Sequence, residues 1–197
     1  ILWHTGIRLG SLRALDVGDF DYDDQSLKIR HRPETGTPLK NKQRAERSLA
    51  VGDHYCEVIS DYLTHNRESV LDDHGRAPLI TSRFGRLSDG AIRESVYLAT
   101  QPCMEGRCPH DRDPDTCEAR QWNSGSQCPG SRSPHGIRRG SISKYLRDGT
   151  PQEVVSDRMN ASKEIPTGTT THASSGRRWR YGESSSRECN ATFLPSL

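Results

Sequence analysis

A long apolar run is missing from this sequence, and its absence argues against a membrane-spanning helix. No stretch of about eighteen consecutive apolar residues occurs, so a transmembrane helix is not expected. The first residues, ILWHTGIRLG, have neither the basic flank nor the small-residue cleavage site of a signal peptide. We therefore expect a soluble, cytoplasmic protein with no membrane partner.

A strong charge of either sign is missing as well. Lys and Arg total 28 against 26 Asp and Glu, which gives a formal net charge of +2. This balance neither requires nor excludes a polyanionic partner, because the distribution of charge decides such binding more than its total. The chain also lacks an initiating Met, and its first residues already have the spacing of an amphipathic helix. We interpret its 197 residues as a fragment, truncated at the N-terminus, that can form one core.

The apolar and capping residues that are present predict a mainly helical α+β fold. Helices are expected over residues 1–15, 53–63, 88–99 and 135–147. Residues 27–32 and 47–51 alternate in character around a Pro- and Gly-rich centre, which predicts a small antiparallel sheet with a basic hairpin. Thr150, Pro151 and Glu153 suit the N-cap, N1 and N3 positions of a further helix, with a capping box.

The C-terminal end lacks any apolar period. Of the last 32 residues 11 are Ser or Thr, and glycines and prolines are scattered among them. A segment of this composition cannot bury enough apolar surface to fold by itself. We therefore predict a folded domain over residues 1–165, with a Cys-rich insert at 101–132, and a disordered or aberrant tail over 166–197.

Two cationic side chains lie three residues apart in SPHGIRRG, at the predicted start of a helix. Residues at this spacing share a helix face, so His135 and Arg138 can approach one ligand. The helix N-terminus adds backbone N–H groups and a positive dipole, and a phosphate is the ligand that suits all three features. Taken alone, such a pair is more often a solvated surface pair, so a phosphate site needs support from other parts of the sequence.

HTGIRLGSLRALDVGDFD resembles the first motif of the tyrosine recombinases, the phage-integrase family, in which a T-G-x-R turn precedes a helix. PHGIRRG resembles the second motif of the same family. The resemblance implies that Arg8, His135 and Arg138 bind the scissile phosphate of double-stranded DNA. It also implies the tyrosine recombinase catalytic-domain fold, an origin in a phage or other mobile element, and homo-oligomers that form on DNA.

Two further family residues can be placed in the order of the chain. The basic hairpin PLKNKQRAERSLAV stands where the family has a lysine that acts as general acid; Lys42 is favoured for this role and Lys40 is the alternative. In SDRMNAS, Asn160 stands where the family has a histidine or tryptophan. Archaeal-like members of the family resemble this chain at that position. Asparagine can donate a hydrogen bond but carries no positive charge. Lys40 and Arg139 are candidates for further DNA contacts.

The mechanism that the resemblance implies is attack by a tyrosine on a DNA phosphate, which needs no metal or nucleotide cofactor. At the positions where the family has this nucleophile, however, the sequence has Thr169 and Thr170. Tyr181 follows too late and has no apolar helix around it. A frameshift near Pro166 would explain both the missing tyrosine and the changed composition, because an alternative reading frame can encode a tyrosine at the expected place.

Four of the six cysteines lie in the insert, at Cys103, Cys108, Cys117 and Cys128. Their spacing is C-x4-C-x8-C-x10-C, and His110 is a spare ligand. Zinc takes four thiolates, or three and a histidine, and would stabilise a segment that has no core of its own. Disulfides, which a reducing cytoplasm disfavours, and free thiols are the alternatives. Such a zinc ion would be structural, and the insert would brace the phosphate-binding helix or touch DNA.

Three functions therefore stay open from the sequence. The first is site-specific DNA recombination or integration, by strand cleavage and rejoining through a phosphotyrosyl intermediate. This chain is then expected to be inactive, because the nucleophile is missing. The alternatives are a non-catalytic DNA-binding remnant, which the missing tyrosine favours, and a zinc-stabilised interaction module, which the set of Arg8, His135 and Arg138 disfavours.

Overall fold

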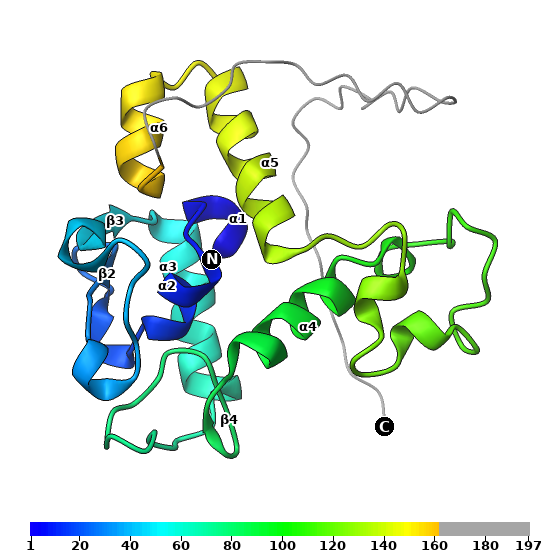
Figure 1. Ribbon diagram of the computed structural model, residues 1–197, viewed down its shortest axis with the longest axis horizontal. Helices are drawn as coiled ribbons and strands as arrows, with labels where there is room; N and C mark the ends of the chain where they lie inside the picture. Colours follow the sequence, from blue (N-terminus) through cyan, green and yellow to red (C-terminus); the bar gives the residue numbers. More distant parts are fainter. Residues whose placement is uncertain (162–197) are drawn as a thin grey trace. The chain divides into compact units, whose positions relative to one another are not determined.

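The structure is a computed structural model, and it describes residues 1–161 (Figure 1). The described part is a mainly helical α+β fold with a small antiparallel sheet, as the sequence predicts. The predicted tail over residues 166–197, with Tyr181, and the frameshift lie outside the described residues. The predicted domain boundary after Ile165 and the sixth cysteine, Cys189, lie outside them as well.

The first helical segment is interrupted at Gly6. Helix α1 spans Leu2–Thr5 and helix α2 spans Leu9–Ala14, so the continuous helix predicted over residues 1–15 is wrong. Gly6 has a φ of +60°, and a Cβ at this position would lie 2.6 Å from Sδ of Met159. Glycine is therefore needed twice, for the left-handed backbone and for the close approach of Met159.

The predicted hairpin forms the centre of a three-stranded antiparallel sheet. Its strands, in the order β1-β2-β3, are Phe20–Asp21, Ser26–Ile29 and Arg47–Ala50. Leu27 and Leu49 are paired across β2 and β3, and both are buried. Alternation in the sequence thus identified β2 and β3, while the two-residue strand β1 was not predicted because it stands among acidic residues.

Two helices and a small hairpin follow the sheet: α3 (Asp53–Asp61), β4 (Thr81–Ser82), β5 (Gly85–Arg86) and α4 (Asp89–Ala99). Helix α3 continues as a π-helical turn over Tyr62–Asn66. Helix α4 begins after the predicted N-cap, Ser88, whose Oγ accepts a hydrogen bond from the N–H of Ala91 at 3.1 Å. Both helices predicted in this region are confirmed.

The last two described helices are α5, over Pro134–Arg147, and α6, over Gln152–Met159. Helix α6 begins one residue later than predicted, and no side chain caps it. The N–H of Thr150 donates instead to the carbonyl of Tyr145 at 2.9 Å. The predicted capping box is therefore wrong, because Thr150 belongs to the turn that ends α5.

One hydrophobic core joins the first two helices, the sheet, α3 and α4. Its most deeply buried side chains include Ile7, Leu15, Leu27, Ile29 and Leu79. Helix α5 contacts both α1 and α6, which lie beside it in Figure 1. Within residues 1–161, none of the helices combines the length and the apolar character that a bilayer span requires.

Short 3-10 turns make up much of the connecting chain. Those within residues 1–161 are Val17–Asp19, Pro33–Thr35, Lys42–Ala45, Pro102–Met104, Glu118–Arg120 and Gly125–Gln127. The turn at Lys42–Ala45 lies in the β2–β3 connection, and the last three turns lie in the Cys-rich insert.

Candidate functional site

The T-G-I-R turn positions Arg8 at the start of α2. Thr5 Oγ1 donates to the carbonyl of Ile1 at 2.9 Å, and the left-handed Gly6 then reverses the chain. Arg8 becomes the N-cap residue of α2, with extended backbone dihedral angles. Its guanidinium makes no hydrogen bond to any residue that the structure describes, and burial lowers the pKa of Arg8.

Arg138 reaches the same turn from α5. Its side chain is buried, and Nη1 donates to the carbonyl of Gly6 and, at 2.7 Å, to the carbonyl of Met159. Arg138 therefore connects three segments that are distant in the sequence: the turn after α1, helix α5 and the end of α6. Both of its partners are neutral carbonyl groups, which position the guanidinium without neutralising it.

Two further arginines complete the site, and the sequence did not identify either as a functional residue. Arg47, at the start of β3, donates from Nε to the carbonyl of Arg158 at 2.8 Å and from Nη1 to the carbonyl of Ala45 at 2.7 Å. Arg158, in α6, donates to the carbonyl of Ala50 at 2.9 Å, and its guanidinium lies over the Tyr145 ring. No motif in the sequence marks Arg47 or Arg158, and the sequence indicates only that each is an arginine in a predicted strand or helix.

We call Arg8, Arg47, Arg138 and Arg158 the unpaired arginine cluster. None of the ion pairs formed within residues 1–161 involves any of the four. Burial, together with the charges of Arg8 and Arg47, lowers the pKa of Arg138 to about 10. Burial and the charges of Arg8 and Arg158 lower the pKa of Arg47 to about 10 as well. With pKa values of about 10, Arg47 and Arg138 remain charged at neutral pH, so the site concentrates positive charge without an acidic partner among residues 1–161.

Asn160 lies beside the site but is already engaged. It ends α6 in a left-handed conformation, with φ of +49°. Its Oδ1 accepts from Nδ2 of Asn41 at 2.9 Å, and its own Nδ2 donates to the carbonyl of Arg44 at 3.3 Å. Asn160 thus ties the end of α6 to the connection that carries the two candidate lysines.

The other sequence candidates lie at the surface: His135, Arg139, Lys40 and Lys42. None of these four side chains has a hydrogen bond or ion pair with a residue in the described part of the chain. Lys42 opens the 3-10 turn with φ of +51°. The structure places Arg8 near enough to Arg138 for its charge to lower the pKa of Arg138, but within residues 1–161 it shows neither His135 nor the lysines in contact with them.

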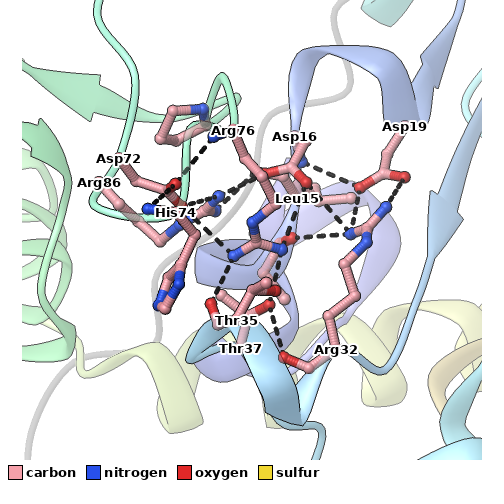
Figure 2. Close-up of polar contacts among 12 residues, drawn as sticks. Leu15, Asp16, Asp19, Arg32, Thr35, Thr37, Asp72, His74, Arg76 and Arg86 are labelled. Atoms are coloured by element: carbon pink, nitrogen blue, oxygen red, sulfur yellow. Dashed lines mark hydrogen bonds and ion pairs between the residues drawn. The ribbon is translucent and has the colours of Figure 1, made fainter.

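A second group of arginines shows the opposite electrostatic arrangement (Figure 2). This paired arginine network consists of Arg32, Arg76 and Arg86 with Asp16, Asp19 and Asp72. Arg32 binds Asp19 with two hydrogen bonds, of 2.6 and 2.9 Å, and these raise the pKa of Arg32. The network joins the segment after α2 to the β2–β3 connection and to the β4–β5 hairpin.

The four cysteines of the insert and His110 line one small cavity. The five cysteines among residues 1–161 are free thiols. Within the same residues, no three His, Cys, Asp or Glu side chains are already positioned to hold a metal ion.

Comparison with known proteins gives no match to a family model. Among solved structures, the XerA recombinase superposes with a TM-score of 0.55 and 17% identity, over 82% of this chain and 45% of that one. The Tn1549 transposon integrase, solved in complex with a circular intermediate DNA, superposes with a TM-score of 0.55 and 15% sequence identity, over 82% of this chain and 48% of that one. The chain has the fold of a tyrosine recombinase catalytic domain. In this tyrosine recombinase fold, the T-G-I-R turn, the β2–β3 hairpin and α5 meet at the unpaired arginine cluster.

Sequence comparisons find similarity to proteins described as tyrosine recombinases and integrases. The tyrosine recombinase XerC of Mycobacterium tuberculosis is 23% identical over 178 residues, which are 90% of this chain and 49% of that protein. The putative integrase/recombinase y4rB of Sinorhizobium fredii is 32% identical over 98 residues, which are 49% of this chain and 28% of that protein. The chain thus spans about half the length of the XerC relatives that it matches.

Proposed function

We propose that this chain is the phosphate-binding part of a site-specific DNA recombinase, which cleaves and rejoins strands through a phosphotyrosyl intermediate. The observation that carries the proposal is the unpaired arginine cluster. Buried cations without carboxylate partners are costly unless an anion completes them. A DNA phosphate is an anion of suitable charge, and planar guanidinium groups can bind two of its oxygens at once.

The roles of the individual residues follow from their positions. Arg8 has no hydrogen-bond partner in residues 1–161, so its guanidinium is available for a phosphate oxygen. Arg138, fixed by the carbonyls of Gly6 and Met159, supplies the second guanidinium. Together they stabilise the negative charge that develops on the phosphoryl oxygens during attack. His135 is the third donor in the proposal, and it joins them when DNA covers the N-terminus of α5.

The β2–β3 connection supplies the general acid in this proposal. Lys42 protonates the leaving 5′ oxygen, and Lys40 is the alternative. Asn160 acts here by holding this connection through Asn41 and Arg44, because both ends of its amide are engaged with them. Lys40 and Arg139, both exposed, contact the DNA backbone outside the reacting phosphate.

The present chain is inactive in this proposal, because Thr169 and Thr170 stand where the nucleophile belongs. A frameshift near Pro166 accounts for the loss, and the nucleotide sequence of the gene tests it. A tyrosine codon at this place in the alternative frame supports the frameshift, and its absence rules the frameshift out. A non-catalytic DNA-binding protein is the second candidate function, and the same missing tyrosine favours it.

DNA binding is tested first, with a short duplex and a fluorescent end label. The logarithm of the binding constant falls with the logarithm of salt concentration in proportion to the phosphates neutralised. Arg8→Gln should weaken binding and reduce the magnitude of this slope by about 1. Arg93→Gln, on the exposed surface of α4, is the matched control and should leave the slope unchanged. Equal slopes for Arg8→Gln and the unsubstituted chain would contradict the phosphate site.

Cleavage is tested with a nicked suicide duplex that carries the attachment sequence flanking the gene. A denaturing gel then reveals any covalent protein–DNA band. We expect no band from this chain and a band when the shifted frame is restored. A band that disappears in Tyr181→Phe would show that the chain is active with a different nucleophile. DNA binding without cleavage in either frame would favour the non-catalytic candidate.

Assembly as a homo-oligomer on DNA is also part of the proposal. Sedimentation with and without the suicide duplex tests it. We expect a monomer without DNA and a larger complex with it; a stable oligomer in the absence of DNA would contradict this step.

A further inference from the structure

The Cys-rich insert has a defined path but little apolar core. Between residues 101 and 132, all of which the structure describes, Cys108 and Ala119 are the buried hydrophobic residues. Met104 and Trp122, its largest apolar side chains, are more than half exposed. Its regular structure consists of three 3-10 turns. Hydrophobic burial of this extent cannot offset the conformational entropy of ordering so many residues.

Polar contacts close the insert at a few points. The N–H of Arg132 donates to Oγ1 of Thr100 at 2.8 Å, which brings the two ends of the insert together. Nε2 of the buried Gln101 donates to the carbonyl of Ala119 at 2.6 Å. The N–H of Gly125 donates to Oε1 of Glu94 in α4 at 2.7 Å. These contacts fix the ends and one side of the insert but leave its centre without a packed core.

The thiols occupy that centre. Cys103, Cys108, Cys117 and Cys128 come from separate turns, yet all four line the same small cavity. Elsewhere in the described chain the fifth free cysteine, Cys56, is a buried residue of α3 and belongs to the hydrophobic core. The convergence of four thiols on one space, inside a segment without an apolar core, is the arrangement that a structural metal stabilises.

We propose that these four cysteines bind one Zn²⁺ ion that holds the insert together. Each thiol releases its proton to solvent as it becomes a thiolate ligand, so four protons leave for each ion bound. A zinc ion with four thiolates carries two net negative charges, and Arg112, which lines the same cavity, offsets part of them. Because the side chains are not yet positioned as ligands, zinc binding draws the turns inward and orders the insert.

The zinc ion acts structurally in this proposal and takes no part in phosphate chemistry. The insert leads directly into Ser133, whose Oγ accepts the N–H of Gly136 and caps α5. Helix α5 carries Arg138. A closed insert therefore fixes the chain that enters the phosphate-binding helix.

The test uses the full chain, purified under reducing conditions and then incubated with Zn²⁺ alone. We expect one zinc ion per chain by mass spectrometry of the native protein and by elemental analysis. Titration with Co²⁺ should give the thiolate charge-transfer absorption and the visible bands of a tetrahedral site. A chelator should release the metal and make residues 101–132 more sensitive to limited proteolysis.

Variants separate the site from chance binding. Cys117→Ser and Cys128→Ser should each lower zinc affinity by at least about tenfold and weaken the cobalt charge-transfer band. Cys56→Ala and His110→Ala are the matched controls and should retain one zinc ion per chain. Loss of zinc in His110→Ala but not in one of the cysteine variants would overturn the four-thiolate assignment.

Other results would overturn the proposal as a whole. These are a chain that binds no zinc when fully reduced, zinc content unchanged in both cysteine variants, or disulfides among the four cysteines under reducing conditions. None of these measurements depends on DNA binding or cleavage, so the zinc site and the proposed function can fail separately.

Discussion

The protein contains two groups of partly or fully buried arginines that differ in their partners. In the paired arginine network, three arginines face three carboxylates (Figure 2). In the unpaired arginine cluster, Arg47, Arg138 and Arg158 donate to backbone carbonyls, and Arg158 also contacts Nε2 of His4 at 3.5 Å. The same side chain therefore occurs in two electrostatic settings, and within residues 1–161 a carboxylate partner is present in one and absent from the other.

The pKa values show what this difference means in energy. Hydrogen bonds to Asp19 raise the pKa of Arg32, so the folded state favours its charged form. Burial and neighbouring guanidinium groups lower the pKa of Arg47 and Arg138 to about 10, so the folded state disfavours the charged forms of these two arginines. Pairing with Asp19 therefore makes the charge of Arg32 compatible with folding, whereas the charges of Arg47 and Arg138 oppose folding unless an anion binds, as we propose. A carboxylate in the cluster would remove that cost but would compete with a phosphate.

Removal of a carboxylate from the paired network should have the largest effect. The Asp19 side chain is 1% exposed, receives two hydrogen bonds from Arg32 and also accepts the N–H of Asp16 at 3.0 Å. Asp19→Asn removes the buried carboxylate that receives two hydrogen bonds from Arg32 and leaves Asp16 as the one acidic partner of Arg32 among the described residues, so we expect a loss of about 3 kcal/mol in the free energy of unfolding. Urea unfolding measures it, and the exposed Asp23→Asn should change stability by less than about 0.5 kcal/mol. Similar values for the two variants would show that the network contributes no net stability.

The second prediction concerns the turn that holds the unpaired cluster. Gly6→Ala forces an L side chain into a left-handed conformation and against Met159, so we expect a loss of about 2 kcal/mol in unfolding free energy. It should also weaken DNA binding, because the carbonyls of Gly6 and Met159 position Arg138. Gly10→Ala is the matched control: its Cβ would meet no atom within 4 Å, and alanine favours the helix. Gly10→Ala should keep or raise stability and leave DNA binding unchanged.

Acid titration tests the paired arginine network separately, because the carboxyl group of Asp72 titrates in the acid range. Burial raises the pKa of Asp72, but backbone N–H groups of Arg76 and His74 and the side chain of Arg86 more than offset this, which brings it to about 2. The folded-state value lies below the ordinary value of 3.8, so the unfolded chain binds more protons between them. Stability from Asp72 is present above about pH 4 and is lost as the pH falls through about 2.

Asp72→Asn should therefore be less stable at neutral pH. Its unfolding free energy should also fall less steeply between pH 4 and 2, because up to one fewer proton is taken up on unfolding. Asp73→Asn, an exposed neighbour, should keep the slope of the unsubstituted chain. Equal slopes in all three chains would mean that Asp72 titrates normally. Arg47 and Arg138, whose pKa values are about 10, stay charged throughout this pH range and contribute nothing to the slope.

Local patterns in the sequence predicted much of the fold. Strands β2 and β3 follow from alternation, and α4 follows from Ser88 as N-cap together with its apolar spacing. The interruption of the first helix was missed because it depends on Met159, which approaches Gly6 from the far end of the described chain. The capping box failed for a similar reason, since the turn after α5 takes up Thr150.

The sequence predicted the site residues that lie in a short motif. It did not predict those that join the site only through contacts between distant segments. Arg8 and Arg138 lie in short motifs, and their meeting at Gly6 follows from the packing of α5 on α1. Arg47 and Arg158 carry no motif, and only the approach of β3 to α6 brings them together. The paired network was missed entirely, because its six members come from segments that the sequence does not show to be neighbours.

Substitution of Arg8 should have the smallest effect on stability, and unlike the other substitutions in the site and network it should stabilise the protein. Its guanidinium has no hydrogen-bond partner in residues 1–161 and lies near the charges of Arg47 and Arg138. Arg8→Gln removes this repulsion, so the free energy of unfolding should rise by about 0.5 kcal/mol in the absence of DNA. Addition of a short duplex should reverse the order, because the unsubstituted chain gains more stability from binding. Thermal unfolding with and without DNA measures both states, with Arg93→Gln as the control. If Arg8→Gln lowers stability without DNA, then Arg8 supports the fold as the paired arginines do, and the division between the two groups does not hold.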